Sequence, residues 1–102
     1  MAKWVCPSVI RVAGLDFQIV FDAVKCAAEN VCGCTMNKPQ IIWLDPTMPE
    51  QMVRATLLHE VMHAICYQYG ICNLLDSKQE EMVVNAISNG LFEIIRDGAV
   101  KF

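Results

Sequence analysis

The residues best suited to chemistry in this sequence are its only two histidines, His59 and His63. At 3.6 residues per helical turn, positions four apart differ by about 40° in direction and lie one turn apart on one face. Both imidazoles can therefore reach a single ion. Glu60 is rotated by about 100° from His59, so its carboxylate would flank such an ion instead of joining the same row of ligands.

This spacing forms a His-Glu-x-x-His motif, in which two histidines bind zinc and the glutamate acts as a general base. The motif lies within residues 55–66 (ATLLHEVMHAIC), which are apolar on nearly every side. A helix of this kind is typical of the centre of a domain, where unpartnered imidazoles and carboxylates are costly. We therefore predict that His59 and His63 bind zinc and that Glu60 is the catalytic base.

A catalytic zinc ion usually has three protein ligands, and the sequence contains no third histidine. Glu80 and Glu81 are the candidates. Ser77-x-x-Glu80 is typical of a capping box, in which the Glu80 side chain folds back onto the helix start. Glu81 is free of that task, and Asn85 follows on the same face, where it could hydrogen-bond a ligating histidine. This favours Glu81, with Glu80 as the alternative.

The sequence predicts two long helices in its second half. Thr47-x-x-Glu50 is typical of a capping box that opens a helix over residues 47–69, which Gly70 would end. The second helix is expected from Ser77 to about residue 96. These two helices would carry all the candidate metal ligands.

Short strands are expected in the first half of the chain. Runs at residues 9–12 and 17–21, and at 31–36 and 40–45, are separated by turn signals and predict two hairpins. Residues 22–30 fit either a short helix or a turn. Strands followed by helices indicate a single α+β domain over residues 1–102, with N-terminal antiparallel strands and hairpins followed by the two helices.

Composition narrows the class of partner. The chain is 55% hydrophobic and 19% charged, with a net charge of −3, which argues against nucleic acid as a partner and favours a peptide or protein. No apolar run approaches the roughly 20 residues that span a bilayer, and the first residues make a poor signal peptide. We therefore expect no membrane association and a cytoplasmic location.

Six cysteines are many for 102 residues: Cys6, Cys26, Cys32, Cys34, Cys66 and Cys72. Without a secretory context, reduced thiols that pack as small hydrophobic groups are expected. Cys32 and Cys34 are too closely spaced for the usual zinc knuckle. Cys66, about one turn beyond His63, is a further alternative as third ligand, although an oxygen ligand suits an open hydrolytic site better.

The order of these motifs resembles the gluzincin-type peptidases, and among them the ImmA/IrrE group of phages and mobile elements. The strand at residues 40–45, the segment Leu57-Leu58-His59-Glu60 and the pair Glu81 and Asn85 carry the resemblance, which covers about residues 40–95. It implies a small zincin-like fold and a cytoplasmic zinc metallopeptidase that cleaves a protein, often a repressor. By this resemblance His59, His63 and Glu81 are zinc ligands and Glu60 is the base.

Two other functions remain open from the sequence. The chain could be a non-catalytic metal-binding domain of a phage or prophage protein that acts by binding another protein, or a metal-free interaction protein with an accidental motif. If the chain is a peptidase, a substrate could pair with strand 41–44, provided that this strand lies at an edge. Tyr67 and Tyr69 are candidates for stabilising the oxyanion.

Overall fold

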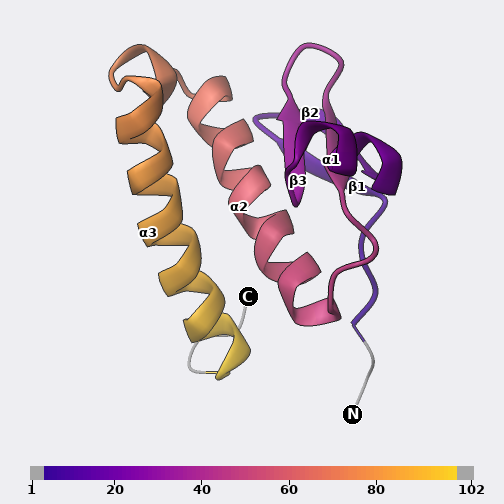
Figure 1. Cartoon of the computed structure of the whole chain (residues 1–102). Helices are drawn as coiled ribbons and strands as arrows, with labels where there is room; N and C mark the ends of the chain where they lie inside the picture. Colours follow the sequence, from indigo (N-terminus) through magenta and orange to yellow (C-terminus); the bar gives the residue numbers. More distant parts are fainter. Residues whose placement is uncertain (1–3, 99–102) are drawn as a thin grey trace.

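The computed structural model describes residues 4–98 and shows a small α+β domain, as predicted (Figure 1). A four-stranded sheet is followed by two long helices. The elements in chain order are β1 (Val9–Val12), β2 (Leu15–Phe21), α1 (Ala23–Glu29), β3 (Gly33–Met36), β4 (Ile41–Leu44), α2 (Glu50–Gln68), a short 3-10 helix η1 (Ile71–Asn73) and α3 (Ser77–Arg96).

The sheet has the order β1-β2-β4-β3. Both predicted hairpins are present, since β1 pairs with β2 and β3 pairs with β4 in antiparallel fashion. The two-residue turn Ala13-Gly14 has φ values of 52° and 79°, the left-handed backbone that tight hairpins need. The central pair, β2 with β4, is parallel and was not predicted. It places β4 inside the sheet and leaves β3 at an edge.

Residues 22–30, which the sequence left undecided, form the helix α1. Asp22 caps its start by accepting a hydrogen bond from the backbone N–H of Lys25, and Asn30 ends it in the left-handed conformation. This helix and β3 together carry the chain from the end of β2 back to the start of β4. A parallel pair requires such a crossover, because the chain must return to the same end of the sheet.

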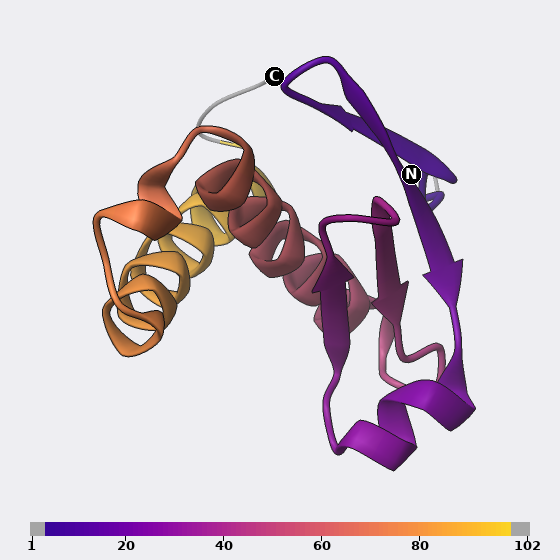
Figure 2. The same cartoon turned by 90° about the horizontal axis from the view of Figure 1, so that it is seen from above.

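The apolar helix α2 lies between the sheet and α3 (Figures 1 and 2). Its residues Val53, Leu57 and Ala64 join the hydrophobic core beneath the sheet. The strands contribute Val12, Phe17, Ile19, Ile42 and Leu44 to the same core. Burial on both sides explains why residues 55–66 lack a polar face, as the sequence analysis expected.

The two capping boxes predicted from the sequence are both wrong. Helix α2 begins at Glu50 with Pro49 at its N-cap, and Thr47 instead donates its hydroxyl to Asp45 at 2.7 Å. Helix α3 is capped by Asp76, whose partner three residues on is Gln79. Aspartate is at least as good an N-cap as serine, so the cap falls one residue earlier than predicted.

Helix α3 packs on the rest of the domain mainly through α2. Among its described residues only Val84 and Ser88 are buried. None of the helices described between residues 4 and 98 combines the length and apolar character that crossing a membrane requires.

Candidate metal centre

Three side chains from two helices converge on one point. His59 and His63 extend from one face of α2, with their Nε2 atoms 3.2 Å apart. Glu81, near the start of α3, places Oε1 2.9 Å from Nε2 of His59 and Oε2 2.9 Å from Nε2 of His63. The three residues predicted as metal ligands are thus brought together, as a group whose ligand atoms lie within 4.8 Å of one another.

Both the donor set and its spacing suit zinc. Two imidazole nitrogens and one carboxylate are a common ligand set for catalytic zinc, with ligand distances of about 2.0–2.2 Å. Tetrahedral geometry at those distances puts ligand atoms about 3.3–3.6 Å apart. The separations of 2.9–3.2 Å fall slightly short of this range, so small outward movements of the side chains would make room for the ion. That these residues hold zinc stays a prediction.

Glu80 contacts the opposite nitrogen of His63. Its Oε2 lies 2.7 Å from Nδ1 of that ring, and both side chains are largely buried. Glu80 was predicted to belong to a capping box, but the cap is formed by Asp76 and Gln79, which frees the Glu80 carboxylate. The preference for Glu81 as ligand therefore rested on a wrong reason, although Glu81 is the glutamate that faces both Nε2 atoms.

Asn85 does not have the role that the sequence suggested. Its side chain is exposed, and within residues 4–98 no hydrogen bond joins it to either histidine. Glu80 takes the place expected for Asn85, because it reaches Nδ1 of His63, the nitrogen of that ring that is not among the three converging atoms.

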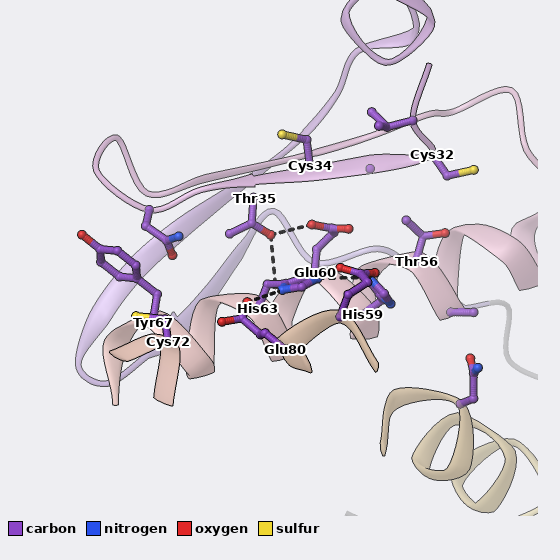
Figure 3. A pocket seen from close by; sticks show the side chains of 16 residues that line it. Cys32, Cys34, Thr35, Thr56, His59, Glu60, His63, Tyr67, Cys72 and Glu80 are labelled. Carbon is purple, nitrogen blue, oxygen red and sulfur yellow. Dashed lines mark hydrogen bonds and ion pairs between the residues drawn. The ribbon is translucent and has the colours of Figure 1, made fainter. Parts of the chain in front are cut away.

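Glu60 lies between α2 and the edge strand β3 (Figure 3). Only 8% of its surface is exposed, and its Oε1 accepts a hydrogen bond of 2.8 Å from the hydroxyl of Thr35. The same hydroxyl lies 2.9 Å from the backbone carbonyl oxygen of Glu60. The predicted base is therefore next to the predicted metal ligands in the chain and hydrogen-bonded to the neighbouring strand.

Gly33 allows β3 to approach α2 closely at this point. A Cβ atom at Gly33 would lie 2.7 Å from Cγ2 of Thr56, 3.1 Å from the carbonyl oxygen of Trp43 and 3.2 Å from Cγ of Glu60. Neither Gly33 nor Thr35 was predicted from the sequence to belong to the site. A glycine inside a strand is a known signal for close backbone approach, and here it marks the wall of the site.

These residues line a cleft of about 670 Å³ (Figure 3). One wall is formed by residues 31–35 and Asn37, and the other by α2 from Ala55 to Tyr67. Cys72 of η1 and Glu80, Glu81 and Asn89 of α3 complete it. Of the two tyrosines proposed as oxyanion donors, Tyr67 lines the cleft, whereas Tyr69 is 66% exposed and is not among its lining residues.

The strand expected to pair with a substrate, β4, lies between β2 and β3 and so has neighbours on both sides. The condition set for substrate pairing with residues 41–44, that this strand lies at an edge, is therefore not met. The reason is the parallel pairing of β2 with β4, which moves β4 inward. The edge strand beside the cleft is β3, whose residues Gly33, Cys34 and Thr35 line it.

The alternative ligand Cys66 is buried and does not belong to the converging group. Burial raises the pKa of its thiol, and the nearby Glu80 raises it further. Cys66 therefore remains a neutral thiol that packs as a small hydrophobic group. All six cysteines are free, and Cys26 is buried in the same way.

Comparison with models of known protein families, with curated proteins and with solved structures gives no match to this chain.

Proposed function

We propose that this chain is a zinc-dependent peptidase of the gluzincin type, as the sequence resemblance suggested. The observation that carries the proposal is the convergence of His59, His63 and Glu81 on one point, with Glu60 in the same cleft. A metal ligand set and an adjacent carboxylate in an open cleft are the parts that hydrolysis by activated water requires.

The chemistry follows from these parts. His59, His63 and Glu81 would hold zinc, which when bound would act as a Lewis acid that lowers the pKa of a water molecule towards about 7 and polarises the peptide carbonyl. Glu60 accepts a proton from the water as the water oxygen attacks the carbonyl carbon. Glu60 then delivers that proton to the leaving amine as the C–N bond breaks. Tyr67 is the candidate second donor to the oxyanion, because its side chain lines the cleft.

The substrate we propose is an extended segment of a protein, for which a cytoplasmic repressor is the example that the resemblance offers. Strand β3 supports this, since it lies at the sheet edge and lines the cleft. A peptide that adds to this edge through main-chain hydrogen bonds would run alongside the metal centre.

Glu60→Gln tests the proposal. The variant keeps the size of the side chain but cannot accept the proton, so zinc content should be unchanged while peptide hydrolysis falls by at least about 100-fold. Hydrolysis of an unstructured protein such as casein, measured with stoichiometric zinc, provides the assay. Equal activity in the wild type and the variant, or no zinc in either, would overturn the proposal.

A second candidate function is a non-catalytic metal-binding domain. The burial of only Val84 and Ser88 in α3 favours it, because a metal held by both helices would then help to fasten α3 to α2. The same experiment distinguishes the two functions. A protein that binds zinc stoichiometrically, needs it for stability and hydrolyses no peptide is the structural domain.

A further inference from the structure

We infer that Thr35 is a positioning residue for Glu60, and that the edge strand thereby sets where the catalytic carboxylate lies. This inference rests on the proposed function for its catalytic consequence. The Thr35 hydroxyl has one proton and two acceptors within reach, Oε1 of Glu60 at 2.8 Å and the Glu60 carbonyl oxygen at 2.9 Å. Both acceptors belong to the same residue, so either arrangement ties Glu60 to β3.

The position of this donor is determined by the sheet and not by α2. Thr35 is paired with Ile42 of β4, and Ile42 is fully buried in the core. Two residues earlier, Gly33 brings β3 so close to α2 that a methyl group there would contact Thr56 and Glu60. Threonine is also stiff about χ1, because its Cβ is branched. The hydroxyl is therefore held in place before any ligand binds.

A fixed donor restricts what the carboxylate can do. A hydroxyl donates more strongly to a carboxylate than to a peptide carbonyl, so we take Oε1 of Glu60 as the preferred acceptor of the Thr35 proton (Figure 3). This assigns the two oxygens different tasks. Oε1 remains bonded to the strand, and Oε2 is the oxygen that exchanges a proton with water and substrate. Losing the donor would let the carboxylate rotate away from the geometry that proton transfer needs.

The variant Thr35→Val tests this, because valine keeps the branched shape and removes the hydroxyl. Thr35→Ser should restore it. The matched control is Thr47→Val, since Thr47 donates its hydroxyl to a carboxylate, Asp45, in the same way at 2.7 Å but on an exposed segment away from the cleft. Thermal unfolding and zinc content are measured for all three variants.

Two measurements follow. In steady-state kinetics with zinc-loaded protein, Thr35→Val should lower kcat by about 10- to 100-fold with KM changed less than about two-fold. Thr35→Ser and Thr47→Val should stay near the wild type. Independently, in protein labelled with ¹³C at the glutamate carboxyl groups, the Glu60 signal should shift in Thr35→Val and return in Thr35→Ser. The signal is assigned by its loss in Glu60→Gln.

The outcomes separate the two proposals. If the wild type hydrolyses no peptide but the Glu60 signal follows the hydroxyl, the peptidase proposal fails and the positioning by Thr35 stands. If the Glu60 signal ignores Thr35→Val, or if kcat is unchanged in a folded, zinc-loaded variant, the inference is overturned. Should Thr35→Val not fold, Thr35→Ala carries the same test, and a wild-type Glu60 signal in that variant would overturn it equally.

Discussion

Nδ1 of His63 lies 2.7 Å from Oε2 of Glu80, while Nε2 of the same ring faces Glu81 at 2.9 Å. A neutral imidazole carries its proton on one nitrogen only. With that proton on Nδ1, the N–H donates a hydrogen bond to Oε2 of Glu80, and the Nε2 lone pair is free for an ion. Carboxylates that orient a ligating histidine in this way are a recurrent feature of zinc sites.

Glu80→Gln should therefore weaken zinc binding by about 10-fold, because glutamine keeps a hydrogen-bond acceptor but loses the charge that favours protonated Nδ1. The zinc dissociation constant is measured by competition with a chromophoric chelator. Glu93→Gln is the control, since Glu93 lies on the exposed part of the same helix and the charge change is identical. Equal affinities for the two variants would show that Glu80 has no part in metal binding.

Glu81 should matter more than its neighbour, because its two oxygens face both histidines. We expect Glu81→Ala to weaken zinc binding by more than about 100-fold, as the loss of a ligand exceeds the loss of an orienting group. Asn85→Ala serves as comparison and should leave the affinity unchanged, since its side chain is exposed. An effect of Asn85→Ala as large as that of Glu81→Ala would contradict the ligand assignment.

Removal of the metal should loosen α3 selectively. The helix buries only Val84 and Ser88 among its described residues, whereas β2, β4 and α2 share the hydrophobic core. At a zinc concentration 100 times the dissociation constant, the ion contributes about 2.7 kcal/mol to the free energy of unfolding. Hydrogen exchange with and without a chelator should show lost protection in α3 before the sheet. An equal loss of protection in α3 and in the sheet would mean that the domain unfolds as one unit.

Two glycine substitutions should have opposite effects on stability. Gly33→Ala would force a methyl group to within 2.7 Å of Thr56 and 3.1 Å of the Trp43 carbonyl oxygen, and should cost about 1–3 kcal/mol in the free energy of unfolding. Gly90 lies within α3, and a methyl group there would have no neighbouring atom within 4 Å. Gly90→Ala should therefore raise the free energy of unfolding by about 0.5–1 kcal/mol. Denaturant unfolding measures both. A Gly33→Ala protein as stable as the wild type would disprove the close approach of β3.

Features that depend on local sequence were predictable. The two hairpins, the two long helices and the convergence of His59 with His63 follow from turn residues and from spacing within one helix. Glu81, the glutamate preferred from the sequence, lies near both Nε2 atoms, but the reason given for the preference, that Glu80 belongs to a capping box, is wrong. The helix start that decides this depends on competition between Asp76 and Ser77 as N-cap, which a pattern of residue types does not resolve.

Features that depend on strand pairing could not be predicted. Nothing within residues 40–45 indicates whether β4 lies at the edge or inside the sheet, because that depends on its parallel pairing with β2, about 20 residues earlier. The contact of Thr35 with Glu60 joins residues 25 positions apart and exists only once β3 lies against α2. Such long-range contacts leave no periodic signal in the sequence.

All three atoms that would face the ion come from the α2–α3 hairpin, whereas the donor to the Glu60 carboxylate comes from the sheet. If the chain binds zinc and hydrolyses peptides as proposed, metal affinity would depend on α2 and α3, whereas the position of the catalytic carboxylate would also depend on β3. Substitutions in residues 33–35 should change the rate without releasing the ion, and changes in the connection that aligns Glu80 and Glu81 should release it. In such a domain, a mutation in the strand would abolish catalysis while the chain kept its bound metal and could still bind another protein.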